Sequence, residues 1–118
     1  MEVQGQGFVA IADNKVEEPI DAGRGGPGNY APFDETLYEG SSDSWDAGPE
    51  VGSASGFTLR TPGFLLYQVV LDLLDGRSFA ASGRLNFDTS PKAGVIPVTG
   101  GGRLKVEFKN PKRYTYTP

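Results

Sequence analysis

The sequence predicts an all-β domain, a small eight-stranded antiparallel β-barrel, from three observations. Glycine and proline are frequent, with 17 and 9 residues among 118, which favours short strands joined by turns over helices. Several segments alternate apolar and polar residues, the period of a half-buried strand. An Asp-Gly pair, Asp75-Gly76, separates two such segments and is a strong hairpin signal. The length suits one domain, so we expect a single barrel domain over residues 1–118.

The first half of the chain contains three predicted strands and two polar loops. The strands are expected at Gly7–Val16, Phe33–Tyr38 and Glu50–Arg60. The glycine-rich segment Asp21–Asn29 and the serine-rich segment Gly40–Gly48 read as loops between them. Because these segments have few apolar anchors, we expect both loops to be mobile and to lie near a mouth of the barrel.

The second half of the chain contains five more predicted strands. The run Phe64–Leu74 is the most apolar, and its length would also suit a helix, but the Asp-Gly turn after it favours a strand. The five strands are Phe64–Leu74, Arg77–Asp88, Ala93–Val98, Arg103–Lys109 and Tyr114–Thr117. Eight strands that close into a barrel leave no exposed edges, and the interior can be filled by side chains or hold one small ligand.

The composition excludes several classes of chemistry. The chain has neither cysteine nor histidine, which excludes disulfides, thiol catalysis, metal sites of thiolate or imidazole, and catalytic triads with an imidazole base. Acid–base chemistry would fall to Asp, Glu, Lys or Tyr. A Mg²⁺ or Ca²⁺ site made of carboxylates alone stays open, but no EF-hand spacing is present, and we expect no cofactor and no metal.

The charge is unevenly distributed along the chain. Residues 1–75 carry 13 acids and 3 bases, a net −10, and residues 76–118 carry 2 acids and 8 bases, a net +6. A basic half can bind nucleic acid, or the two halves can complement each other. The absence of a compact Lys/Arg cluster favours the second interpretation. We therefore expect no nucleic-acid partner, and expect the halves to meet across strand pairs or in a homodimer.

The sequence gives no sign of export or membrane insertion. Met1–Ala10 lacks the basic start and apolar run of a signal peptide. No apolar stretch approaches the roughly 20 residues of a membrane-spanning helix. These observations predict a cytoplasmic protein with no membrane partner.

Apolar side chains on the predicted strands either line an interior cavity or fill it. Glycines inside strands indicate bends or space for a ligand, and small residues on the same faces favour an open cavity. Trp45 is either a lid over a pocket mouth or a packed loop anchor. The cavity candidates are Phe57, Tyr67, Val69, Phe79, Leu85 and Phe87, with the small residues Ser53, Ser55, Ala81 and Gly83 and the strand glycines Gly52 and Gly56.

Two further features have ordinary explanations. The adjacent acids Asp34/Glu35 and Glu17/Glu18 do not form catalytic pairs, because neighbours on a strand point to opposite faces. We expect them to be solvated charges. The glycine-rich segment Thr99–Arg103 opens a strand rather than a helix, so it reads as a turn and not as a phosphate loop.

A series of short motifs, taken in order, resembles the allene oxide cyclase and dirigent barrel superfamily. The likeness is closest to the bacterial spirotetronate cyclases, small barrels that catalyse intramolecular [4+2] cycloadditions of the Diels–Alder type in polyketide antibiotic biosynthesis. It extends from about Phe8 to Tyr116. The motifs are Phe33–Tyr38, Val51–Gly56, Tyr67-Gln68, Asp75-Gly76, Ala81–Gly83, Phe87-Asp88 and Pro97–Arg103.

The resemblance implies a substrate pocket inside the barrel. Ile96 stands where a related cyclase has tyrosine. The positions that match pocket residues of the family are Phe33, Tyr67, Phe87 and Ile96, followed on the last strand by Arg113, Tyr114 and Tyr116.

Two functions from different classes remain open. The first is a cofactor-independent cyclase that folds a linear polyene or polyketide inside the barrel, so that diene and dienophile meet. Tyr67 is the first candidate for a hydrogen-bond donor to the substrate carbonyl, and Arg113 the second. The second function is a non-catalytic, dirigent-like or carrier barrel that binds a small apolar ligand. Both functions need the same apolar cavity, so the sequence leaves the choice open.

Overall fold

The computed structural model describes residues 6–13, 29–41, 46–61, 63–86, 93–108 and 111–118, and within these ranges it contains strands and no helix. The all-β prediction is confirmed. All eight predicted strands are present, although the second begins at Asn29 rather than at Phe33. The strands are β1 (Phe8–Ala12), β2 (Asn29–Glu39), β3 (Glu50–Thr61), β4 (Phe64–Leu73), β5 (Ser78–Asn86), β6 (Ala93–Pro97), β7 (Arg103–Glu107) and β8 (Arg113–Thr117).

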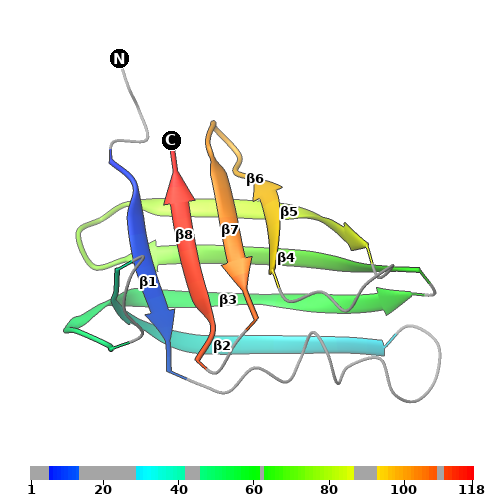
Figure 1. The fold of residues 1–118 in the computed structure, drawn as a ribbon, viewed down its shortest axis with the longest axis horizontal. Coiled ribbons are helices and arrows are strands. Elements are labelled where there is room, and N and C mark those ends of the chain that lie inside the picture. The colour runs from blue at the N-terminus through cyan, green and yellow to red at the C-terminus, as the bar shows by residue number, and fades with distance from the viewer. Residues whose placement is uncertain (1–5, 14–28, 42–45, 62, 87–92, 109–110) are drawn as a thin grey trace.

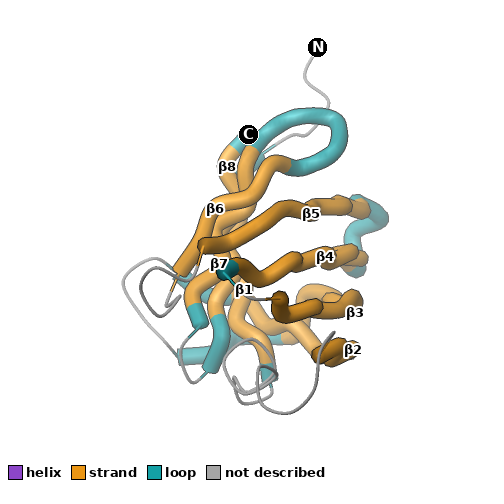
Figure 2. The backbone as a smooth tube through the Cα atoms, turned by 90° about the vertical axis from the view of Figure 1, so that its right-hand side faces the viewer, coloured by secondary structure: helices purple, strands orange, loops and turns teal. Residues whose placement is uncertain are grey.

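The strands form one antiparallel sheet that curls into a nearly closed barrel. Their order is β5-β4-β3-β2-β1-β8-β7-β6. In Figure 1 the long strands β2 to β5 form one layer, and the shorter strands β1, β8, β7 and β6 cross it. Figure 2 shows the two layers from the side. The edges β5 and β6 meet at a bridge between Ala81 and Val98, beside which the Thr99 amide donates to the Ala80 carbonyl oxygen at 2.8 Å.

Side chains close the rest of the seam between β5 and β6. A Cβ atom on Gly83 would lie 2.8 Å from Cγ2 of Ile96. A Cβ atom on Gly94 would lie 2.4 Å from Cδ2 of Leu85. The sequence analysis interpreted Gly83 as a possible space for a ligand. The side chain of Ile96 occupies that space.

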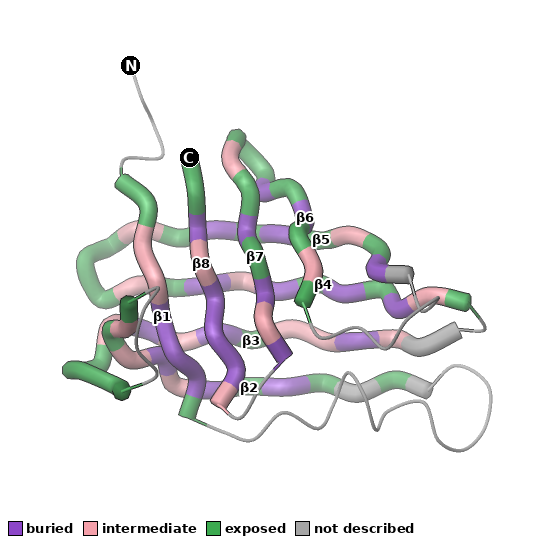
Figure 3. Tube along the Cα trace, in the orientation of Figure 1, coloured by how far each residue is buried: buried purple, intermediate pink, exposed green. Residues whose placement is uncertain are grey.

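The core lies between the two layers, where buried positions concentrate (Figure 3). Strand β4 shows the pattern most clearly, because Leu65, Tyr67, Val69 and Leu71 are all buried while the residues between them are more exposed. This alternation confirms the period-two interpretation of the run, against a helix. Among the described residues, no helix could cross a membrane, since none has the required length and apolar character.

The hairpin predicted at Asp75-Gly76 is present. The Gly76 amide donates to the Leu73 carbonyl oxygen at 3.0 Å, and the Leu73 amide donates to the Arg77 carbonyl oxygen at 2.9 Å. Gly76 has a φ of +99°, a conformation that glycine adopts without the steric cost that a Cβ imposes. The turn therefore explains why glycine stands at this position.

Close contact between β3 and β4 yields a stability prediction at Gly56. A Cβ atom there would lie 1.9 Å from the backbone oxygen of Gln68. Gly56→Ala is expected to push the two strands apart and to lower the free energy of unfolding by about 1–3 kcal/mol, measured by chemical denaturation. Ser55→Ala, an exposed neighbour on β3, is the control and should change it by no more than about 0.5 kcal/mol. Equal stabilities for the two variants would contradict the prediction.

Candidate functional site

Four polar side chains meet inside the barrel. They are Glu35 of β2, Tyr67 of β4, Lys112 immediately before β8, and Tyr114 of β8. The Lys112 Nζ atom lies 3.2 Å from Oε2 of Glu35, and both side chains are 0% exposed. The Tyr114 hydroxyl donates to the same carboxylate oxygen, and the hydroxyls of Tyr67 and Tyr114 are 3.0 Å apart. We call these four residues the buried cluster.

The chemistry of the groups sets the direction of the hydrogen bonds. The carboxylate of Glu35, paired with an ammonium, accepts hydrogen bonds and donates none. The one hydroxyl proton of Tyr114 is used on Glu35, so the proton between the two tyrosines comes from Tyr67. The order is therefore Tyr67 to Tyr114 to Glu35. Tyr67 can donate to a ligand when its hydroxyl turns away from Tyr114.

Aromatic rings surround the cation of the buried cluster. The Lys112 Nζ atom lies 4.4 Å from the ring centroid of Phe33, 5.5 Å from that of Tyr114 and 5.9 Å from that of Tyr67. Ring faces attract a cation, and the attraction grows when water is excluded. The ammonium of Lys112 is thus held by the Glu35 carboxylate together with three rings.

Burial also fixes the protonation state of Tyr114. Desolvation raises the pKa of the Tyr114 hydroxyl well above its ordinary value, and interactions with Tyr67 and Glu35 raise it further. A hydroxyl with such a pKa stays neutral at physiological pH and acts as a hydrogen-bond donor rather than as a phenolate. The arrangement can therefore hold a donor chain in place, and it disfavours a tyrosinate base.

The sequence analysis missed two members of the buried cluster. Glu35 was expected to be a solvated charge, which is wrong, because Asp34 points outward and Glu35 points into the core. A signal was present: Glu35 lies in phase with the buried residues Phe33 and Leu37. Lys112, Tyr114 and Tyr116 are each two positions apart, so their side chains point to the same side of the chain. The predicted strand began at Tyr114, so this alternation was not extended back to Lys112.

Most of the predicted pocket residues that the structure describes lie in the interior. Tyr67 stacks on Phe33 with ring centroids 5.6 Å apart, and its edge meets Phe108 at 5.7 Å. These contacts pack the space around the Tyr67 ring with side chains. The interior residues of the predicted set are Phe33, Tyr67, Val69, Phe79, Ala81, Leu85, Ile96, Tyr114 and Tyr116.

Arg113 lies on the opposite side of β8 from Tyr114. Its Nε atom donates to Oε1 of Glu107 at 2.8 Å, and its Nη1 atom donates to the Ser41 carbonyl oxygen at 3.0 Å. The expectation that Arg113 donates a hydrogen bond into the interior is therefore wrong. Strand alternation is the physical reason, since two consecutive residues on a strand cannot face the same side.

Phe57 also points away from the interior. Its neighbour Thr58 is 0% exposed and faces the core, whereas the Phe57 ring contacts the exposed ring of Tyr30, with centroids 5.3 Å apart. Ser53 and Ser55 point outward, as Phe57 does. Their small size therefore creates no cavity inside the barrel. The assignment of Phe57 to an interior pocket is wrong for the same reason.

Several predicted features cannot be placed. Trp45 and Phe87 lie outside the described residues, as do positions 17, 18, 21–28 and 42–44. For Trp45 and Phe87 the roles of lid and pocket residue stay predictions.

The structure contains a pocket of about 430 Å³ at one end of the barrel. It lies where β1 begins, β2 ends and β4 turns into β5, at the left of Figure 1. None of the described residues predicted as site residues lines it. We call it the mouth pocket; its lining is Gly7, Phe8, Val9, Glu39, Gly40, Glu50, Val51, Leu73, Leu74, Asp75 and Arg77.

The described part of the chain shows no metal site, since no three acidic side chains there are grouped to hold a cation. Comparisons of the chain with protein-family models, with curated proteins and with solved structures gave no match. The likeness to the spirotetronate cyclases therefore stays a prediction from the sequence motifs.

Proposed function

We propose that this barrel is a cofactor-independent cyclase that acts on a linear polyene of the polyketide type by an intramolecular [4+2] cycloaddition. The observation that carries the proposal is the buried Tyr67 hydroxyl, which donates to Tyr114 within a hydrogen-bond chain enclosed by a mostly apolar core. Such a reaction needs a shaped apolar enclosure and one polarising donor, and it needs no nucleophile. The motif resemblance supports the same choice. The proposal also includes a cytoplasmic location and a homodimer.

The buried cluster assigns separate tasks to its members. The substrate carbonyl conjugated to the dienophile accepts a hydrogen bond from Tyr67, whose hydroxyl turns from Tyr114 toward it. The Glu35–Lys112 pair keeps Tyr114 oriented, so that the position of Tyr67 is maintained while its proton changes partner. Substrate enters by displacing side chains that pack against Tyr67, such as Phe33.

Tyr67→Phe tests the proposed role of the hydroxyl. The variant should keep the fold and slow conversion of a linear polyene about tenfold, because a cycloaddition develops less charge than acyl transfer, where one lost donor costs on the order of 10²-fold. Product formation is followed by liquid chromatography with mass detection, because the cyclised product has the same mass as the linear polyene and must first be separated from it. The melting temperature is measured on the same samples. Tyr30→Phe removes a hydroxyl from an exposed ring that contacts Phe57 on the outer face of the barrel, and should leave turnover unchanged.

Two results would count against the catalytic role. Unchanged turnover in folded Tyr67→Phe protein would leave only the shape of the barrel to explain catalysis. Lower stability with unchanged turnover per folded molecule would make the hydroxyl a structural group.

A specific observation favours a second candidate, a non-catalytic carrier. The space beside Tyr67 is packed by Phe33 and Phe108, while the pocket of about 430 Å³ lies at the mouth. A carrier needs only that pocket. Binding of polyenes without conversion, unaffected by Tyr67→Phe, would select this candidate over the cyclase.

A further inference from the structure

We propose that the mouth pocket is a binding site for an uncharged apolar molecule that carries a carbonyl group, held by a hydrogen bond from Arg77. The proposal goes beyond the cyclase function, because it requires neither Tyr67 nor turnover. It rests on the fixed position of the Arg77 guanidinium, on the apolar walls of the pocket and on the charges at its rim.

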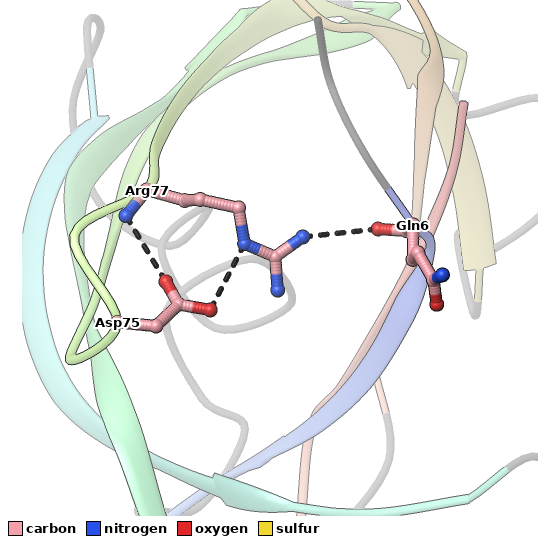
Figure 4. Close-up of polar contacts among 3 residues, drawn as sticks. All are labelled: Gln6, Asp75 and Arg77. Atoms are coloured by element: carbon pink, nitrogen blue, oxygen red, sulfur yellow. Dashed lines mark hydrogen bonds and ion pairs between the residues drawn. The ribbon is translucent and has the colours of Figure 1, made fainter. Parts of the chain in front are cut away.

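Arg77 spans the mouth of the barrel and is held at both ends (Figure 4). Its Nε atom donates to Oδ2 of Asp75 at 3.0 Å, and its Nη1 atom donates to the Gln6 carbonyl oxygen at 3.1 Å. The Arg77 amide also donates to Oδ1 of Asp75 at 3.0 Å. A guanidinium fixed in this way loses little conformational entropy when it binds a ligand.

One nitrogen of the guanidinium retains its donors. Within the described ranges, the hydrogen bonds of Arg77 use Nε and Nη1, and none uses Nη2. Arginine carries five N–H donors and no acceptor. A ligand that meets Arg77 in the pocket must therefore bring an acceptor.

The walls of the pocket favour an apolar body. Phe8, Val51, Leu73 and Leu74 line it, and Leu74 is 70% exposed, a large apolar surface that a ligand would cover. The pocket volume of about 430 Å³ falls within the range of small-molecule sites. The guanidinium also lies 5.7 Å from the ring centroid of Phe8, next to these walls.

The charged groups around the pocket disfavour a carboxylate, and Arg77 requires an acceptor that an ammonium lacks. Glu39, Glu50 and Asp75 line the pocket and repel a carboxylate. An ammonium is attracted by these acids, but it has no acceptor for the Arg77 guanidinium, which repels it. Interactions between the backbone and side chain of Arg77 and the Asp75 carboxylate lower the pKa of Asp75, so this pair keeps both charges well below neutral pH. A carbonyl oxygen avoids both repulsions and accepts from Nη2.

A matched series of naphthalene probes tests the proposal in the intact protein. Acetylnaphthalene carries the carbonyl, and isopropenylnaphthalene replaces its oxygen with a methylene group of the same shape. Naphthoate and naphthylethylamine carry, at the same ring position, a substituent with a negative and a positive charge respectively. Dissociation constants are measured by titration, and amide NMR shifts locate the binding.

The ketone should bind about three- to tenfold more tightly than its hydrocarbon isostere, since a hydrogen bond to a partly exposed charged donor adds this much. Naphthoate and the amine should both bind more weakly than the ketone. The amide signals of Gly40, Val51 and Leu74 should shift on binding. Equal affinity of ketone and isostere, tighter binding of either charged probe, or shifts elsewhere would overturn the proposal.

Arg77→Met should abolish the preference for the ketone. Arg84→Met is the matched control, because Arg84 also covers an aromatic ring, with its Cζ atom 4.6 Å from the centroid of Phe64, but does not line the pocket. A ketone preference that survives Arg77→Met would overturn the proposal. If this variant unfolds, the affinities of the four probes for the wild-type protein still test the proposal. Loss of polyene turnover in Tyr67→Phe has no bearing on these measurements, so the two proposals fail separately.

Discussion

Lys112→Met is expected to lower the free energy of unfolding by about 3–5 kcal/mol, the usual cost of removing one partner from a buried ion pair. The methionine fills a similar volume, so the loss comes mainly from the charge. Glu35 would keep a carboxylate in the core without the ammonium that lies 3.2 Å from it. The rings that face the ammonium would also lose a cation. Chemical denaturation followed by circular dichroism gives the difference.

The control for this prediction is Lys105→Met. Lys105 lies on β7 with its side chain 49% exposed and its Nζ atom 3.9 Å from Glu107, and an exposed pair of this kind contributes at most about 1 kcal/mol. The double variant Lys112→Met/Glu35→Gln removes both charges and should be more stable than Lys112→Met alone. A Lys112→Met protein as stable as Lys105→Met would mean that the Glu35 carboxylate does not need its partner.

Tyr114→Phe is expected to lower the free energy of unfolding by about 2–4 kcal/mol. Tyr114 is the middle of the chain, so the substitution takes a donor from the charged Glu35 and an acceptor from Tyr67. Tyr116→Phe removes a hydroxyl whose bond to the Gly101 carbonyl oxygen is 3.2 Å long, and should cost about 1 kcal/mol or less. Similar losses in the two variants would contradict the central place of Tyr114.

The same variant carries a pH signature. The pKa of Tyr114 in the folded protein is raised above the ordinary 10.0, so the folded state holds this proton more tightly than the unfolded state. Its contribution to stability is complete below about pH 10 and is lost as the pH rises toward the folded-state pKa. Wild-type protein should therefore lose stability more steeply above pH 10 than Tyr114→Phe. Denaturation curves measured across this pH range test the direction of the effect. The same pH dependence of stability in both proteins would contradict the prediction.

The strands could be predicted because their signals are local. Residues 64–73 alternate as a strand does, and Asp75-Gly76 sets the turn that follows. Such patterns depend on neighbours in the chain, and a sequence displays them directly. The seam at Gly83 could not be interpreted in this way, because the side chain that fills it belongs to Ile96, on another strand.

The site was harder to predict, because it depends on which face each residue takes and on partners far away in sequence. Arg113 and Tyr114 are consecutive, so only one of them can face the interior, and the sequence analysis placed both there. Glu35 was judged beside Asp34, whereas its environment is set by Lys112, 77 positions along the chain. A charge is interpreted as solvated until its partner is known, and only the folded barrel brings that partner close.

The strand order has a consequence for the way the protein assembles. Apart from β1 and β8, the strands that lie side by side also follow one another along the chain. Each of those pairings can form as soon as two successive segments exist, with little loop entropy to overcome. The pairing that aligns Phe8 with Tyr116 must instead join segments from opposite ends of the described chain. On a translating ribosome, β1 therefore has one neighbour early, in β2, and gains its second only after β8 has left the exit tunnel.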